Sequence, residues 1–151
     1  MKEKKALIKV IGRQNYDEND NDKIELTTIG TLEETGEKYI LRYNEQLEAN
    51  RAPIKTKLSV NKDEGRVELM RSGAYGSLLI IERSKRNLCT YATEYGDLLM
   101  GIYGKSIENR VEENEGKITF GYDVDINGAL TSQNEVTVEF RIKNQENRCQ
   151  N

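Results

Sequence analysis

The chain has 151 residues, of which 32% are charged, and its formal net charge is −3. The length suits one domain over 1–151, and the interspersed charges argue against nucleic acid, which favours a basic surface. Histidine is absent, which excludes Ser-His-Asp and Cys-His catalysis and histidine-based zinc and haem sites.

The two ends of the chain bear on its compartment. The start, "MKEKKALIK", resembles the beginning of a signal peptide, but its apolar run stops at Lys9. No later segment reaches transmembrane length, so we expect a cytoplasmic protein with no membrane partner. The two cysteines, Cys89 and Cys149, suit a reducing compartment without a disulfide. Residues 1–3 and the polar tail 144–151 are expected to fray.

Alternation of apolar and polar residues, typical of half-buried antiparallel strands, recurs along the chain. It predicts strands at 6–15, 23–33, 38–46, 54–61, 66–72, 77–83, 88–94, 97–107, 117–126 and 135–143. Turn sequences such as "ETGEK", "NKDEG" and "EYGD" separate most of them. Short links favour an all-β, antiparallel up-and-down barrel with little helix, because closure removes exposed edges. The strand count stays open between eight and ten, since 77–83 and 88–94 can bend or merge.

The acidic segment "YDENDND" (16–22) has Asp17, Asn19 and Asn21 at alternate positions, as in a calcium-binding EF-hand loop. However, Asp22 stands where that loop needs glycine, and Thr28 stands where it needs glutamate. No helices are predicted beside it. We therefore predict an exposed hairpin loop, with no metal and no other cofactor.

The last two strands constrain the turn between them. Even-numbered residues are apolar on both sides of "ING" (126–128), as in Val124 and Val136. A two-residue Asn127-Gly128 loop would pair even positions with odd ones and turn Val136 to the wrong face. The sequence therefore predicts either a three-residue loop or a compensating β-bulge near Ser132–Asn134.

A polar residue ends the inward-facing row of each of three consecutive strands. Arg71 shares the parity of Val67 and Leu69, Glu45 shares that of Tyr43, and Thr56 lies early in the strand between them. In an up-and-down order, the three side chains meet at one end of the sheet. A buried arginine needs a carboxylate and hydrogen-bond acceptors, so Glu45 is its expected partner, with the Tyr43 and Thr56 hydroxyls nearby.

Tyr91 and Thr93, in phase with Cys89 in "CTYATEYG", are further candidates, although the pattern does not fix their face. Two interpretations of the Arg71 cluster compete. In the first, the ion pair and hydroxyls close one end of a barrel filled by bulky side chains such as Phe120, Tyr122 and Phe140. In the second, Arg71 anchors an anionic or carbonyl-bearing ligand in a cup that Tyr43 and Tyr91 help to line. The sequence favours the first.

The order "YILRYNEQ", "IKTKLSV", "VELMRSG", "TYATEYG" and "ITFGYDVDI…VTVEFRI" resembles the YwiB-like family of bacterial proteins, from about Ile8 to Ile142. The residues at that family's motif positions are Tyr43, Glu45, Thr56, Arg71, Gly73, Tyr91, Thr93 and Gly96. The resemblance implies a calycin-like barrel, similar in shape to lipocalins, in a bacterial cytoplasmic protein, and it implies no activity. Gln14 stands where the lipocalin Gly-x-Trp signature has tryptophan, so lipocalin ligands are not carried over.

Three hypotheses about function follow. The first is a barrel that binds a small ligand at its mouth through Arg71, Glu45, Thr56, Tyr43, Tyr91 and Thr93. The second is a structural or partner-binding protein with a filled barrel and no ligand. The third, which the sequence favours least, is an enzyme with Glu45 as general base and Tyr91 as general acid. The oligomeric state is left open.

Overall fold

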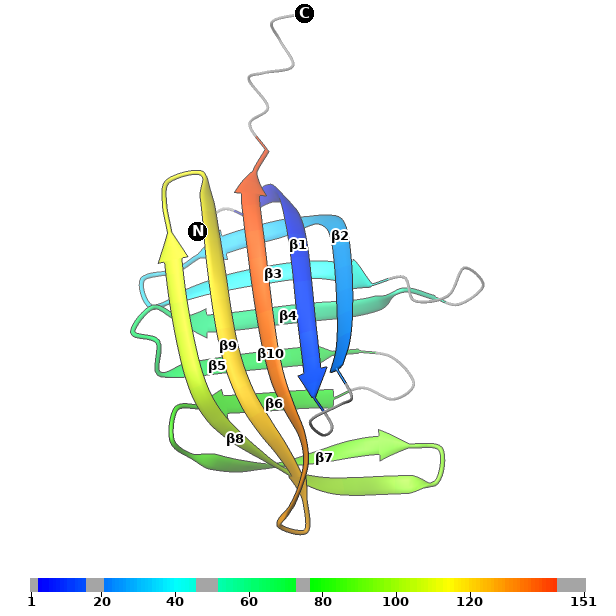
Figure 1. Cartoon of the computed structure of the whole chain (residues 1–151). Helices are drawn as coiled ribbons and strands as arrows, with labels where there is room; N and C mark the ends of the chain where they lie inside the picture. Colours follow the sequence, from blue (N-terminus) through cyan, green and yellow to red (C-terminus); the bar gives the residue numbers. More distant parts are fainter. Residues whose placement is uncertain (1–2, 16–20, 46–51, 73–76, 144–151) are drawn as a thin grey trace, which may run out of the picture.

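The computed structural model describes residues 3–15, 21–45, 52–72 and 77–143, which form ten strands and no helix (Figure 1). The strands are β1 (Glu3–Asn15), β2 (Asn21–Glu34), β3 (Lys38–Glu45), β4 (Ile54–Asn61), β5 (Arg66–Arg71), β6 (Ser77–Glu82), β7 (Arg86–Thr93), β8 (Gly96–Val111), β9 (Glu115–Ile126) and β10 (Ala129–Ile142). The all-β prediction is confirmed, with ten strands. Within the described part of the chain there is no helix with the length and apolar character that crossing a bilayer requires.

The strand boundaries differ from the predicted ones mainly at the ends. Glu3, which we expected to fray, is the first residue of β1, and its carboxylate pairs with the Arg42 guanidinium at 3.1 Å. β8 continues to Val111 instead of ending at 107. Residues 1–2 and 144–151, the rest of the expected frayed ends, lie outside the described residues, as do residues 16–20 of the acidic segment.

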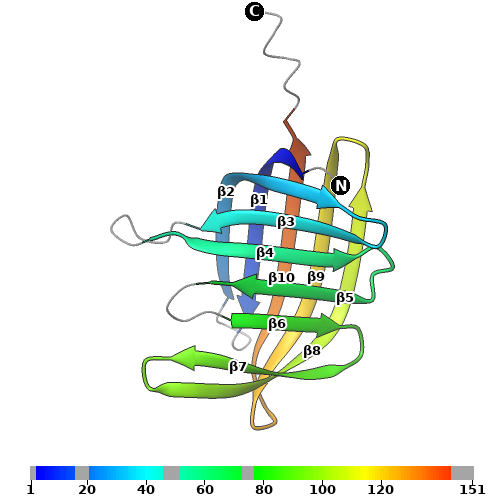
Figure 2. The same ribbon diagram turned by 180° about the vertical axis from the view of Figure 1, so that it is seen from behind.

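The ten strands form one antiparallel sheet in the order β6-β5-β4-β3-β2-β1-β10-β9-β8-β7. Each strand pairs with its neighbour in sequence except β6 with β7, which are the two edges of the sheet, and the pairing of β1 with β10 joins the two halves. β3–β6 cross β1 and β8–β10 at a steep angle, behind them in Figure 1 and in front of them in Figure 2, so that the sheet wraps into a nearly closed barrel. The predicted up-and-down order is therefore correct.

The barrel closes between β6 and β7, where side chains replace a backbone ladder. The side-chain amide of Asn87 donates to the backbone carbonyl of Ile80 at 3.3 Å, and the Cys89 thiol donates to the backbone carbonyl of Leu78 at 3.1 Å. At the end of this seam the Ser84 amide donates to the carbonyl of Gly104 at 2.9 Å. We call this β6–β7 boundary the seam.

The hydrophobic core lies inside the barrel, as the alternation predicts. Val67 and Leu69 of β5 are buried, as are Ile118 and Phe120 of β9, while their chain neighbours face outward. The Phe120 and Tyr122 rings stack with centroids 6.2 Å apart. Removal of these apolar side chains from water is the main force that holds the barrel together.

The last hairpin has the two-residue loop together with a compensating bulge. Asn127 and Gly128 have φ angles of 54° and 86°, the left-handed values that a type I′ turn needs. The register then shifts between Leu130 and Ser132, so that Thr131 is the extra residue. The bulge alternative is confirmed, with the bulge just before the predicted Ser132–Asn134 segment, and it restores the inward face of β10.

Candidate functional site

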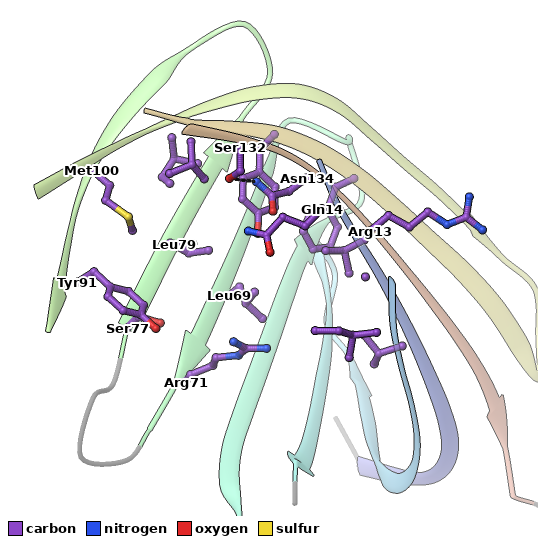
Figure 3. A pocket seen from close by; sticks show the side chains of 18 of the residues that line it. Arg13, Gln14, Leu69, Arg71, Ser77, Leu79, Tyr91, Met100, Ser132 and Asn134 are labelled. Carbon is purple, nitrogen blue, oxygen red and sulfur yellow. Dashed lines mark hydrogen bonds between the residues drawn. The ribbon is translucent and has the colours of Figure 1, made fainter. Parts of the chain in front are cut away.

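A cavity of about 440 Å³ lies inside the barrel. Its lining includes Glu45, Arg71, Thr93 and Ile126, the last residues of β3, β5, β7 and β9, so it extends to the end of the barrel where these strands finish. Figure 3 shows the pocket from close by, with Arg71 among its labelled residues. We call this end the mouth. The deeper lining is apolar and includes Leu58, Leu69, Leu79, Met100, Ile102, Phe120 and Val138.

The cavity contradicts the interpretation of a barrel filled by its own side chains. Phe120, Tyr122 and Phe140 are buried inside, as expected, but the curvature of ten strands leaves more room than they occupy. The remaining volume is within the range of sites for small molecules, about 300–1,000 Å³.

Arg71, Glu45 and Thr56 meet at the mouth, as parity and strand direction predicted. Thr56 is the cross-strand partner of Arg71 in β4 and β5. An Arg71 Nη atom donates to Glu45 Oε1 at 3.1 Å, and the Thr56 hydroxyl donates to Glu45 Oε2 at 3.0 Å. Both carboxylate oxygens of Glu45 are therefore engaged, each by a different strand.

Exposure distinguishes the two partners of this ion pair. The Glu45 side chain is 8% exposed, whereas that of Arg71 is 47% exposed. The sequence predicted a buried arginine, and this prediction is wrong, because Arg71 is the last residue of β5 and its long side chain reaches the open mouth. The carboxylate is fixed in the wall, and the guanidinium borders the cavity (Figure 3).

Two tyrosines from different strands also line the cavity. Tyr43 of β3 and Tyr122 of β9 are both buried and both line the cavity. Burial raises the pKa of Tyr43, the charge of Glu45 raises it further, and the Arg71 guanidinium opposes the rise. Burial also raises the pKa of Tyr122, again against the effect of Arg71. Arg71 of β5 and these two tyrosines of β3 and β9 therefore line one cavity.

Tyr91 and Thr93 approach the cavity from β7, which settles the face that the sequence left open. Tyr91 is half-exposed, and Figure 3 shows its ring beside Ser77 of β6. The Thr93 hydroxyl donates to the Gly96 carbonyl at 2.6 Å and accepts from the Tyr95 amide at 3.2 Å. Thr93 therefore lines the cavity while its hydroxyl stabilises the β7–β8 turn.

Sequence reasoning missed several polar residues of the lining. They are Gln14, Ser77, Tyr122, Ser132 and Asn134. Tyr122 was assigned to the barrel filling, although its phase with Phe120 already placed it inside. Ser132 and Asn134 share the parity of Val136, and the Asn134 amide donates to the Ser132 hydroxyl at 3.0 Å. Parity was the signal that could have found them.

No metal site arises from the described residues, where no three His, Cys, Asp or Glu side chains are grouped to hold an ion. Cys89 has a free thiol, and burial raises its pKa. Gly73, which the family resemblance included, lies outside the described residues. Gly96 has a φ of 116° in the β7–β8 turn, a conformation that side chains rarely adopt.

Comparisons with known proteins agree with this fold. A family described as "Domain of unknown function (DUF1934)" matches residues 8–138. The uncharacterised β-barrel protein YwiB of Bacillus subtilis (strain 168) is 26% identical over 124 residues, which are 82% of this chain and 84% of that protein. A crystal structure of the ywiB protein from Bacillus subtilis matches with a TM-score of 0.78 and 24% identity, covering 94% of each chain. The match over most of the chain, together with the shared barrel, places this protein in the DUF1934 family, the family of YwiB that the residue pattern resembled.

Proposed function

We propose that the barrel binds a small, largely apolar molecule with an anionic or carbonyl-bearing head group, which Arg71 holds at the mouth. The apolar part would lie against the deep lining, including Leu69, Leu79 and Met100. Burial of apolar ligand surface would supply most of the affinity, and the polar mouth would set the orientation.

One observation carries this proposal: hydrogen-bonding groups around the cavity have unused capacity. Among the described residues, the Tyr43 and Tyr122 hydroxyls have no hydrogen-bond partner, although both side chains are buried. Arg71 shares a single hydrogen bond with Glu45 there, and a guanidinium has five N–H donors. Because these residues all line the cavity, a ligand oxygen there would be within reach of their free hydrogen-bonding groups.

The competing hypotheses have less support. A structural or partner-binding role was tied to a filled barrel, and the cavity argues against that premise. Glu45 accepts hydrogen bonds from Thr56 and Arg71, so we assign it no role as a general base. The calycin-like shape implied by the resemblance agrees with binding, and the free thiol of Cys89 agrees with a reducing, cytoplasmic location.

Native mass spectrometry of the protein purified from its own host tests the proposal. We expect a bound mass that disappears on denaturation. Arg71→Met should weaken its retention by about 10- to 100-fold, the value of a hydrogen bond to a charged group. Arg110→Met, a change on the exposed side of β8 away from the cavity, is the matched control and should retain the ligand.

Two results would contradict the proposal. A wild-type protein without a bound mass under native conditions would argue against a ligand. Undiminished binding by Arg71→Met would mean that Arg71 does not bind the head group. Since Arg71→Met leaves the Glu45 carboxylate without its cation, the double variant R71M/E45Q, in which both charges are removed, should be measured beside it.

A further inference from the structure

We infer that Glu45 determines the specificity of this site and makes it prefer a neutral, oxygen-bearing head group, such as an amide, ketone or alcohol, over a carboxylate. This inference rests on the proposed function and narrows it. It concerns the charge of the ligand, which the cavity volume and the apolar lining leave open.

The charged residues around the cavity do not favour the binding of an anion. Four charged residues belong to the described lining: Arg13, Asp22, Glu45 and Arg71. Figure 3 shows the Arg13 side chain directed away from the other labelled residues of the pocket. The remaining three are two carboxylates and one guanidinium. The formal charge of the described lining is therefore zero with Arg13 and −1 without it.

The Arg71 charge is already compensated. Its Nη atom lies 3.1 Å from Glu45 Oε1, the distance of a charge-assisted hydrogen bond. A ligand carboxylate that contacted Arg71 would also lie close to the Glu45 carboxylate. Repulsion between the two like charges in a partly desolvated site would offset the attraction to the guanidinium.

Glu45 cannot easily turn away to relieve this repulsion. Its side chain is 8% exposed, and the Thr56 hydroxyl holds its second oxygen at 3.0 Å. Tyr43, two residues before it on the same face of β3, is paired with Thr56 in the β3–β4 ladder. The negative charge is thus a fixed part of the wall, whereas Arg71 is the more exposed partner.

A neutral head group has no such conflict. The carbonyl oxygen of an amide or ketone accepts hydrogen bonds from the unused Arg71 N–H groups and from a tyrosine hydroxyl without adding charge. Tyr43 and Tyr122 keep their protons at neutral pH, since burial raises the pKa of both. They are therefore available as donors to such an oxygen.

Decanoate and decanamide form a matched pair of probes, because their head groups have nearly the same shape and differ in charge. Calorimetric titration at about pH 8, well above the usual carboxyl pKa, compares them on the whole chain. Wild-type protein should bind decanamide more tightly. Glu45→Gln should raise the ratio of decanoate affinity to decanamide affinity by about tenfold, equivalent to about 1.4 kcal/mol. Glu139→Gln, an equal change of net charge on the outer face of β10, should leave the ratio unchanged.

The outcomes separate this inference from the proposed function. Tighter binding of decanoate by the wild type, or a ratio unaffected by Glu45→Gln, would overturn the inference and leave ligand binding intact. Binding of neither probe by the wild type would count against the proposed function, and the inference would fall with it. If Glu45→Gln does not fold, the comparison of Arg71→Met with the double variant R71M/E45Q provides the second test, because the two differ only in the Glu45 charge and the double variant should show the higher ratio; equal ratios would overturn the inference.

Discussion

The hydroxyls of Tyr43 and Tyr122 should make the barrel less stable as the pH becomes alkaline. Burial raises the pKa of both in the folded chain, while the unfolded chain ionises near the ordinary tyrosine value of about 10. Above that value the unfolded state loses protons that the folded state retains. The stability associated with each group is therefore complete below about pH 10 and is lost as pH rises further.

Replacement of Tyr43 by phenylalanine should make this alkaline loss less steep. One tyrosine contributes up to about 1.4 kcal/mol per pH unit between its unfolded and folded pKa values. Urea unfolding at about pH 9 and about pH 11 would measure the difference. Tyr95→Phe is the control, because Tyr95 is 92% exposed and its removal should leave the slope unchanged. Equal slopes for wild type and Tyr43→Phe would show that Tyr43 ionises normally.

For the cluster at the mouth, the sequence was sufficient to predict which side chains share a face. Parity predicts that Tyr43, Glu45, Thr56 and Arg71 lie together. The hydrogen bonds of Glu45 to Thr56 and Arg71 confirm this for three of them, and the pairing of Tyr43 with Thr56 confirms it for the fourth. Parity carries no information on how far along the barrel axis a side chain is covered. The half-exposure of Arg71 depends on where β5 ends relative to its neighbours, which is a tertiary property.

Among the strands, Gly104 has a particular role, because it lets β8 pass close to β6. A Cβ atom at this position would lie 2.1 Å from the Glu82 carbonyl oxygen, a backbone atom that cannot move aside. Gly104 also exchanges backbone hydrogen bonds with Ser84 and Lys85. Close approach at the end of the seam therefore depends on the missing side chain.

Gly104→Val should destabilise the protein by about 1–3 kcal/mol or more, the cost of overpacking a closed contact. The midpoint of urea unfolding measures this cost. Gly36→Ala is the matched control, since nothing lies within 4 Å of its added Cβ and its backbone is not left-handed. It should be neutral or slightly stabilising, because alanine reduces the freedom of the unfolded chain. An equally stable Gly104→Val protein would mean that β6 and β8 do not approach this closely.

Local sequence signals explain why the strands and their order could be predicted. The last hairpin illustrates this: the parity conflict across Asn127-Gly128 required a correction, and the chain supplies it as a bulge at Thr131. Gly104 could not have been found in the same way. Its close neighbour, Glu82, belongs to another hairpin, and contacts between hairpins leave no periodic trace in the sequence.

For the molecule as a whole, the local patterns predict an up-and-down strand order, but they do not predict how the two edges of the sheet meet. The order β6-β5-β4-β3-β2-β1-β10-β9-β8-β7 leaves β6 and β7 at the two edges. The side chains of Asn87 and Cys89 hold these edges together through the carbonyls of Ile80 and Leu78. The size of the cavity depends on how these edges meet. The sequence carries no signal for that contact, and for this reason it favoured a filled interior.

The seam should be the line along which the barrel opens first. In an antiparallel strand the N–H and C=O groups of one residue point to the same side. The Leu78 and Ile80 carbonyls face the seam, so their amides face it too, whereas the amides of Leu79 and Ile81 face β5. Within the described residues, the seam-facing amides have no ladder partner.

Native-state hydrogen exchange, followed by NMR, tests this within a single strand. The amides of Leu78 and Ile80 should exchange at least about tenfold faster than those of Leu79 and Ile81, which share their local environment but are paired with β5. Asn87→Ala should accelerate exchange of Leu79 and Ile81 as well, because it removes one of the side-chain links across the seam. Equal protection of all four amides in the wild type would mean that another strand or chain completes the ladder in solution, and the barrel would then be closed by a partner instead of by Asn87 and Cys89.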